Sequence, residues 1–282
     1  MEKKFYMDWD NEILQEEFIN NILADEDLAK IRSLVIGRWG ECWDEESCQL
    51  IIDMFVEHAE RFAHLESLFV GDMESEECEI SWIKQGDYSR LYAALPNLKK
   101  LTIKGAQGLE LGEIAHDKLE HLEIISGGTP CGVFASLQNA HLPALKTLIV
   151  YIGIENYGFD ASIDIVMKLA SKSLFPSLMH LGLMNSEEQN EITRRVLESD
   201  ILPQLEVLAL SCGTLTNEGA EYLLKHADRL SHLKLLDLHH HYMTEDMQKK
   251  LQKTLKCTLE LSEALTSEVY DDEVYMHAMF TE

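Results

Sequence analysis

Three consecutive histidines, His239, His240 and His241, are the residues that most readily suggest chemistry, because imidazole is a common zinc ligand. In an extended segment the side chains alternate, so His239 and His241 share one side of the chain and His240 faces the other. A catalytic zinc site needs converging protein ligands and an open position. The run therefore favours a structural or interface role. His239 and His241 stay weak candidate metal ligands, and we expect no cofactor.

Other catalytic patterns give little support to an enzyme. No G-x-S-x-G elbow is present. The glycine-rich stretch 127–132 has neither phosphate-binding spacing nor the lysine of a phosphate-binding loop, which predicts a plain turn. The positions of the cysteines suggest no cysteine–histidine pair and no C-x-x-C motif, so we expect reduced thiols without a metal. The cysteines are Cys42, Cys48, Cys78, Cys131, Cys212 and Cys257.

The segment 37–43, Gly-Arg-Trp-Gly-Glu-Cys-Trp, places large side chains between glycines. Tryptophan and arginine are frequent hot spots of protein interfaces. Arg38 and Trp39 are therefore candidate partner contacts. The alternative is that Trp39 and Trp43 pack under this loop as part of an N-terminal core.

A short phrase that returns eight times sets the positions of these candidates: an aliphatic residue, two of any kind, an aliphatic, one of any kind, an aliphatic. The phrases begin at Ile31, Leu65, Leu98, Leu119, Leu145, Leu178, Leu205 and Leu233. This self-similarity is typical of a leucine-rich repeat solenoid, in which each repeat buries its apolar face against its neighbours. We predict an α/β fold, a curved horseshoe with a parallel concave sheet of about 8–10 strands and helices on the convex side.

The two ends of such an array need caps, because a terminal repeat exposes an apolar face and a sheet edge. We assign residues 1–30 to an N-terminal capping strand and helix, 31–256 to the repeat array, and 257–282 to a C-terminal cap strand and acidic tail. Alternating apolar residues from Val274 to Phe280 predict a strand that covers the C-terminal edge. The alternative is a disordered acidic tail.

Helices between the strands are predicted where apolar residues at helical spacing follow a side chain that can cap a helix. The expected N-caps are Asp44, Asp160, Thr216 and Thr244. His241 falls at the repeat position where an asparagine-like side chain bonds the backbone of the turn, which predicts a structural role.

Outward residues of the strands form columns across the concave face, because strand side chains alternate between the two faces. Many of these positions hold apolar or histidine side chains. Contiguous exposed apolar surface suggests a binding site, or a segment of the chain that covers it. The candidate partner contacts on this face are Phe69, His121, Ile125, Ile149, Tyr151, His180, Met184, Val207, Leu235 and His239.

Two levels of resemblance follow from these motifs. Residues 201–220, which run from a strand phrase into Leu-Thr-Asn-Glu-Gly, resemble the ribonuclease-inhibitor class of leucine-rich repeats. The stretches 34–41, 157–160 and 236–242 resemble an uncharacterised family of bacterial repeat proteins. The family resemblance implies a solenoid in a bacterial cytoplasm with no assigned activity. It also implies an accessory role, by association with genes for radical-SAM-like and ATP-grasp-like enzymes.

The charge of the chain narrows the choice of partner. Fifty acidic residues against 24 basic give a formal charge of −26, which repels nucleic acid and anionic membranes and suits a basic protein. The N-terminus lacks the apolar region of a secretory signal, so we expect a cytoplasmic protein. We hypothesise a non-catalytic module that binds a protein or peptide on its concave face. The alternatives are an accessory or scaffold subunit of an enzyme complex, or a metal-dependent enzyme that uses the histidine run.

Overall fold

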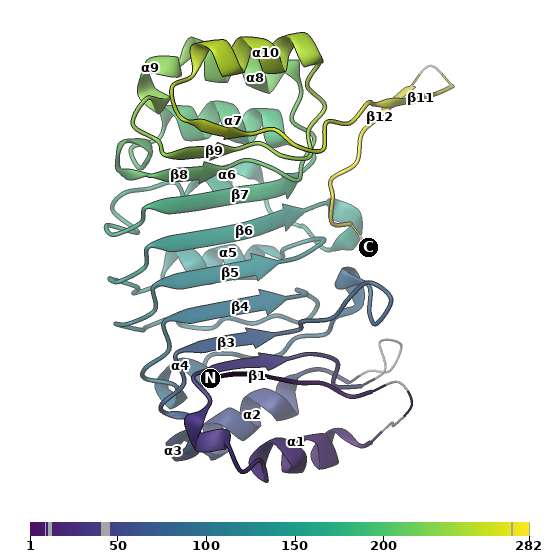
Figure 1. The fold of residues 1–282 in the computed structure, drawn as a ribbon, viewed down its shortest axis with the longest axis vertical. Helices are drawn as coiled ribbons and strands as arrows, with labels where there is room; N and C mark the ends of the chain where they lie inside the picture. Colours follow the sequence, from purple (N-terminus) through teal and green to yellow (C-terminus); the bar gives the residue numbers. More distant parts are fainter. Residues whose placement is uncertain (9, 11–12, 41–45, 272, 282) are drawn as a thin grey trace.

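The computed structural model of the chain describes residues 1–8, 10, 13–40, 46–271 and 273–281. Ten strands form one sheet in which β1 to β10 lie in chain order, and every neighbouring pair is parallel (Figure 1). The strands are β1 Glu2–Phe5, β2 Ser33–Ile36, β3 Ser67–Val70, β4 Lys100–Lys104, β5 His121–Ile125, β6 Thr147–Gly153, β7 His180–Ser186, β8 Val207–Ala209, β9 Leu235–Asp237 and β10 Thr258–Glu260.

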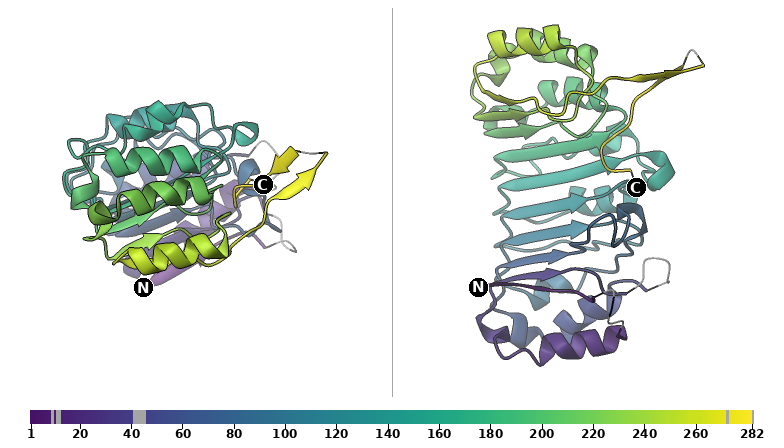
Figure 2. Two further views of the ribbon diagram at one scale, coloured as in Figure 1. Left: turned by 90° about the horizontal axis from the view of Figure 1, so that it is seen from above. Right: turned by 45° about the vertical axis from the view of Figure 1, so that its right-hand side comes forward.

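Helices connect the strands and lie on one face of the sheet (Figures 1 and 2). The α-helices are α1 Gln15–Leu23, α2 Gln49–Glu57, α3 Ala59–Phe62, α4 Leu91–Ala94, α5 Cys131–Gln138, α6 Ile163–Met167, α7 Gln189–Glu198, α8 Asn217–Lys225, α9 Ala227–Leu230 and α10 Glu245–Thr254. Short 3₁₀ turns are η1 Leu28–Lys30, η2 Ile80–Trp82, η3 Glu155–Tyr157 and η4 Leu202–Gln204. The mixed α/β fold with its parallel sheet is as predicted.

The aliphatic residues of the repeated phrase form the core between the sheet and the helices. On β6, Leu148 and Val150 are fully buried, while Thr147, Ile149 and Tyr151 on the opposite face are half-buried. Burying one such aliphatic side chain contributes about 1.5–3 kcal/mol. The repetition of this pattern along the stack explains why an array of short strands is stable, and it leaves alternate side chains free to form a second surface.

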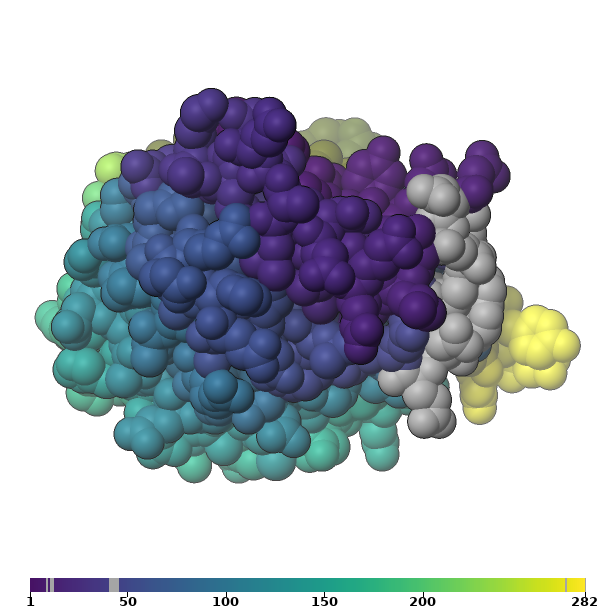
Figure 3. All heavy atoms as spheres, turned by 90° about the horizontal axis from the view of Figure 1, so that it is seen from below, coloured from purple at the N-terminus to yellow at the C-terminus, as the bar shows by residue number. Residues whose placement is uncertain are grey.

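The N-terminal end of the stack is closed by residues that precede the first phrase. β1 adds to the sheet beside β2, with Glu2 opposite Ser33 and Phe5 opposite Ile36. Phe18 and Ile22 of α1 are buried in the same core. Seen from this end, the first part of the chain covers the end of the stack, and the C-terminal hairpin projects beyond it at one side (Figure 3).

The predicted helix caps have mixed outcomes. The hydroxyl of Thr216 accepts a hydrogen bond from Glu218 N, and that of Thr244 accepts one from Met247 N, as N-caps do. Asp160 does not cap the helix that follows it; α6 begins after Ser162. The carboxylate of Asp160 instead accepts a bond from Cys131 N at the start of α5, one repeat earlier. Asp44 lies outside the described residues.

The prediction of a strand from Val274 to Phe280 is wrong in part. The strand there, β12 Glu273–Tyr275, does not cover the sheet edge; it pairs antiparallel with β11 Glu268–Tyr270 in a separate hairpin. Residues 276–281, which we call the C-terminal segment, are not a strand. They turn back onto the loops at the carboxyl ends of β6 to β9 (Figure 1). The apolar positions therefore match loops of the sheet's rim and not its open edge.

The prediction of six reduced thiols is also wrong at one position. Cys78 is disulfide-bonded, whereas Cys48, Cys131, Cys212 and Cys257 are free. Cys42 and Trp43 lie outside the described residues. Disulfides form in oxidising compartments and are rare in the cytosol. The disulfide of Cys78 therefore gives no support to a cytoplasmic location, which stays a prediction. Across the described ranges, every helix is too short or too polar to cross a bilayer.

Candidate partner-binding rim

The parallel register places the outward residues in rows, as the repeat predicts. In the first row, His121, Thr147, His180, Val207 and Leu235 follow one another across β5 to β9. The second row includes Phe69, Glu123, Ile149 and Asp237, and the third includes Ile125, Tyr151 and Met184. Most candidate contacts therefore share one surface. Phe69 is on the same face but lies apart from the other contacts, because β4 and β5 separate it from Ile149.

The third row ends in an apolar cluster at the carboxyl ends of the strands. Met184 and Cys212 are 4% and 1% exposed, and Ala209 is buried with them. Tyr151 and Phe280 pack against this cluster, with their ring centroids 5.3 Å apart in an edge-to-face arrangement. Met184 was expected to be an exposed contact. That expectation is wrong, because the chain's own C-terminal segment covers it.

Polar contacts hold the C-terminal segment in place. The side chain of Asn185 binds both backbone groups of Phe280: its Oδ1 accepts from Phe280 N at 2.8 Å and its Nδ2 donates to Phe280 O at 2.7 Å. Met279 N donates to Cys212 O at 2.8 Å. The hydroxyl of Tyr242 accepts from His277 N at 2.9 Å. We call the loops beneath this segment, at the ends of β6 to β9, the covered rim.

The two N-terminal candidates are not on a free surface. Arg38 is buried, and its Nε donates to Gly40 O, while its own carbonyl accepts from Met7 N. Trp39 is 3% exposed and belongs to the core. The expectation that both contact a partner is wrong, because Arg38 and Trp39 are both buried. For Trp39 this is the alternative that the sequence had left open.

Histidines and acids form the polar half of the sheet face that lies opposite the core. His121 Nε2 lies 3.3 Å from Glu123 Oε2, and Thr102 donates to the same oxygen. Burial opposes ionisation of Glu123, but its interactions with His121, Lys100 and Thr102 together outweigh burial and lower its pKa. Burial lowers the pKa of His180, so that imidazole is held neutral. The face can therefore offer both hydrogen-bond acceptors and a carboxylate to a partner.

The histidine run divides between separate environments. His241 is buried, its Nε2 is 3.3 Å from Leu261 O, and its Nδ1 accepts from Met243 N, the structural role that the repeat predicts. His240 Nε2 is 3.2 Å from His277 O. Among the described residues, no group of three histidine, cysteine, aspartate or glutamate side chains could hold a metal ion.

The third histidine makes a contact that the sequence did not suggest. His239 Nδ1 lies 2.7 Å from Asp237 Oδ1, and His239 Nε2 lies 3.1 Å from Cys212 Sγ. Asp237 and His239 belong to one repeat and Cys212 to the one before it, 27 residues earlier. The parallel register, with Ala209 opposite Asp237, would bring Ser211 and not Cys212 opposite His239, so the contact between Cys212 and His239 is known only from the structure. Burial, followed by the charge of Asp237, raises the pKa of the Cys212 thiol to about 12.

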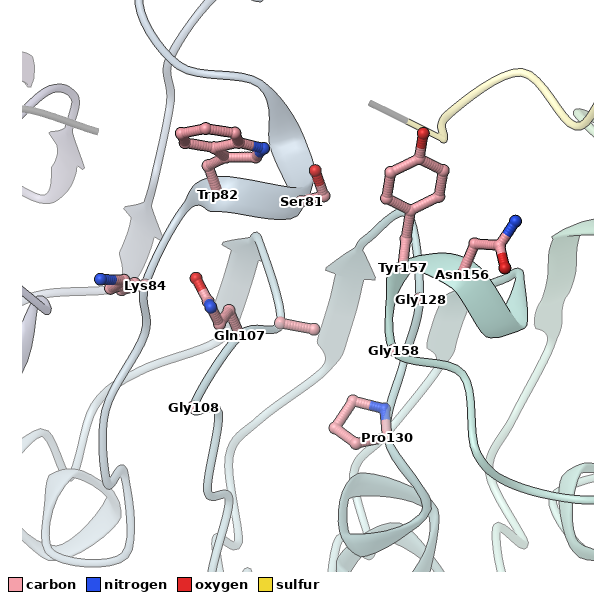
Figure 4. A pocket seen from close by; sticks show the side chains of 11 residues that line it. Ser81, Trp82, Lys84, Gln107, Gly108, Gly128, Pro130, Asn156, Tyr157 and Gly158 are labelled. Atoms are coloured by element: carbon pink, nitrogen blue, oxygen red, sulfur yellow. The ribbon is translucent and has the colours of Figure 1, made fainter. Parts of the chain in front are cut away.

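An open cleft of about 700 Å³ lies beside the covered rim (Figure 4). Trp82 and Ser81, from the connection after β3, face Tyr157 and Asn156, from the connection after β6. Backbone of the glycine-rich turn at Gly128 lines the cleft between them. The region 157–160 thus adjoins that turn. Trp82 was not singled out from the sequence, because it stands alone between repeats.

Comparisons with known proteins give one strong similarity. The chain is similar to a protein from Bacteroides fragilis whose crystal structure was determined as a structural genomics target: the two are 40% identical, with a TM-score of 0.91. The match covers 99% of this chain and 77% of that chain. No family model matches this chain, and a search of curated proteins gave no match.

A second similarity is too distant to support any argument. The crystal structure of a TLR13–ssRNA13 complex is 15% identical, with a TM-score of 0.44, and the match covers 93% of this chain and 35% of that chain. The match to the Bacteroides fragilis protein is of a different order, because it combines high identity with nearly complete coverage. By that likeness, this chain belongs to the same bacterial protein family as the Bacteroides fragilis protein.

Proposed function

We propose that the chain is a leucine-rich repeat solenoid that binds a protein or peptide on its concave face and carboxyl-end rim. One observation carries the proposal: the chain's own C-terminal segment lies on the covered rim as a peptide ligand would. It presents one aromatic side chain to an apolar cluster and bonds its backbone to Asn185 and Cys212. Such a site recognises a backbone and a single apolar anchor.

The partner's chemistry follows from the surface. An aromatic or large apolar side chain would replace Phe280 against Tyr151. Basic residues in that partner fit the formal charge of −26 and the carboxylates of Glu123 and Asp237 on the same face. The open cleft extends the surface toward Trp82, whose ring is half exposed and free to pack on a partner. The C-terminal segment is then a competitor that keeps the apolar rim out of water until the partner arrives.

A labelled peptide with the sequence of residues 273–281 tests the proposal by fluorescence anisotropy. The full-length Phe280→Asp variant should bind the peptide, because a half-buried carboxylate against the apolar cluster beside Tyr151 is unfavourable and releases the internal competitor. Wild type should bind it at least roughly tenfold more weakly, because the internal segment has the advantage of effective concentration.

Two matched controls accompany this titration. Val274→Asp changes the exposed hairpin and leaves the covered rim intact, so it should behave as wild type. A peptide that carries Ala in place of Phe280 should bind the Phe280→Asp protein weakly. Equal binding of both peptides, or no binding to the Phe280→Asp protein, would show that the rim does not recognise an extended chain through an aromatic anchor.

A further inference from the structure

Cys212, His239 and Asp237 form a connected row of a thiol, an imidazole and a carboxylate. A carboxylate can only accept hydrogen bonds, so His239 Nδ1 carries the proton that Asp237 Oδ1 accepts at 2.7 Å. This leaves Nε2 as the acceptor, and the Cys212 thiol donates to it across 3.1 Å. The Oδ2 of Asp237 accepts from the Ser211 hydroxyl at 3.4 Å. Nucleophile, base and orienting carboxylate thus stand in the order of a cysteine–histidine–aspartate triad.

The contact between His239 and Cys212 differs from the contacts that other histidine rings make. The imidazoles of His116, His232 and His241 each contact a main-chain carbonyl, which fixes a loop. His239 instead joins two reactive side chains. Cys48 gives the same contrast for thiols, because it is buried against Gln85 and Tyr88 with no imidazole.

The backbone at Cys212 adds a second observation. Its φ of 64° lies in the left-handed region, which Asn185, near the end of β7, and His240, after β9, also adopt. The turn of the repeat therefore imposes this conformation, in which asparagine or glycine is the favourable residue. Cysteine gains nothing there conformationally, so the residue type at this turn, and not its backbone conformation, needs another explanation.

We propose that Cys212 is a masked nucleophile for acyl groups, with His239 as its base and Asp237 as the residue that orients the base. The C-terminal segment is its cover: Met279 N bonds to Cys212 O, and Phe280 packs on the cluster around the thiol. This proposal rests on the proposed rim function only in that the same segment must move. A peptide or acyl ligand that takes its place would bring a carbonyl to the sulfur.

The chemistry balances with water as the co-reactant. The thiol proton passes from Sγ to His239 Nε2 as the sulfur forms a bond to the acyl carbon, and Asp237 stabilises the imidazolium. The bond from that carbon to the leaving group then breaks, and the leaving group takes the proton from Nε2. Water attacks the thioester, gives its proton to Nε2, and the proton returns to the sulfur as the carboxylic acid departs.

The electrostatics of the closed state agree with masking. Burial raises the pKa of the thiol to about 12, so the covered sulfur is protonated and unreactive. Release of the segment admits water and removes that burial. The titratable groups that act on this site from neighbouring segments are Tyr151, Asp237, Glu260 and Glu263.

Small reagents test the thiol without any peptide partner. We would treat full-length protein with iodoacetamide from pH 5 to 9 and follow Cys212 by peptide mass spectrometry. Phe280→Ala should raise its alkylation rate near neutral pH on the order of tenfold or more over wild type, because the cover is weakened. The rate should rise with pH at a lower pH than that of Cys257, an internal reference. Adding His239→Gln to Phe280→Ala should remove both effects.

Acyl transfer is measured on the same proteins with p-nitrophenyl acetate. Phe280→Ala should release p-nitrophenol and carry acetyl on Cys212, and Cys212→Ser in that background should do neither. Phe280→Asp serves as a second opening variant, and circular dichroism checks folding. The proposal is overturned if Cys212 in both opened variants reacts no faster than Cys257, or if His239→Gln changes neither rate nor pH profile. Peptide binding in anisotropy together with an inert thiol would overturn this proposal and leave the rim function standing.

Discussion

The covered rim and the open cleft are neighbouring parts of the loops at the carboxyl ends of the strands. They differ in how their apolar side chains are exposed to water. At the covered rim, apolar side chains such as Met184 are kept from water by Phe280 of the chain's own end. At the open cleft, Trp82 stays half exposed between loops held by glycine backbone. The two adjoin at Gly127, where Thr281 O approaches the glycine-rich turn. The rim is thus covered by the chain itself, whereas the cleft is open in this structure.

The largest predicted effect on stability concerns a glycine of the turns beside the open cleft. Gly153 has a φ of +77°, and a Cβ there would collide with the carbonyl of Gly127. Gly153→Ala should lower the free energy of unfolding by about 4 kcal/mol or more, because backbone atoms have no rotamer to escape into. Gly132→Ala is the matched control: with open space around it in α5, it should be neutral or stabilising by up to about 1 kcal/mol. Urea titration measures both; a mild effect at Gly153 would show that the turn yields.

Two tryptophans near the cleft should separate stability from binding. Trp39→Ala should cost about 3–5 kcal/mol, because a buried ring leaves a cavity. Trp82→Ala, at a ring that is 50% exposed, should change stability by less than about 0.5 kcal/mol. Thermal and urea unfolding measure the two effects. Similar costs at both positions would mean that the cleft is closed in solution.

The clamp on the covered rim should have an intermediate effect. Asn185→Gly keeps the left-handed backbone, with its φ of 59°, and removes the amide that binds Phe280. We expect a loss of about 1–3 kcal/mol, because the bond to Ser126 O is lost as well. Limited proteolysis after Phe280 or Met279 should become faster in this variant. Unchanged cleavage would mean that the amide does not hold the segment.

The smallest effect is a pH dependence at His241. Burial lowers the pKa of His241 below its ordinary value of 6.5, so the unfolded chain takes up the proton first as the pH falls. Its contribution to stability is present above pH 6.5 and is lost as the pH falls through the folded-state pKa. His241→Asn should therefore flatten the stability profile between pH 7 and 5, by at most about 1.4 kcal/mol per pH unit. His141→Asn, at an exposed position, should leave the profile unchanged.

Much of this fold could be predicted from the repeated phrase. The alternation of aliphatic residues within a phrase predicts a strand with one buried face, and the return of the phrase predicts that each strand pairs with the strand of the next repeat. The rows of side chains on the sheet face opposite the core follow from the same periodicity, including the places of His121 and His180. The C-terminal cover could not be derived in full, since Val274 to Phe280 alternate like a strand, while the side chain that binds the backbone of Phe280 is Asn185, near the carboxyl end of β7. No local pattern encodes a contact across 95 residues.

The Cys212–His239 contact was missed for a related reason. The register of β8 and β9, with Ala209 opposite Asp237, brings Ser211 opposite His239, so neither sequence spacing nor register predicts the contact of His239 with Cys212. Arg38 and Trp39 were wrongly predicted to be partner contacts, because the residue type alone does not tell an interface hot spot from a buried side chain. Burial separates them, and burial depends on which way the loop folds.

Amide hydrogen exchange of the wild-type protein, read residue by residue, tests the cover of the rim most directly. The account predicts slow exchange at Met279 and Phe280, whose amides bond to Cys212 O and to Asn185, and fast exchange at Val269 and Val274 in the projecting hairpin. Phe280→Asp should bring Met279 to the fast rate of the hairpin. Equally fast exchange at all four amides in the wild type would contradict the account, because the rim would then be uncovered.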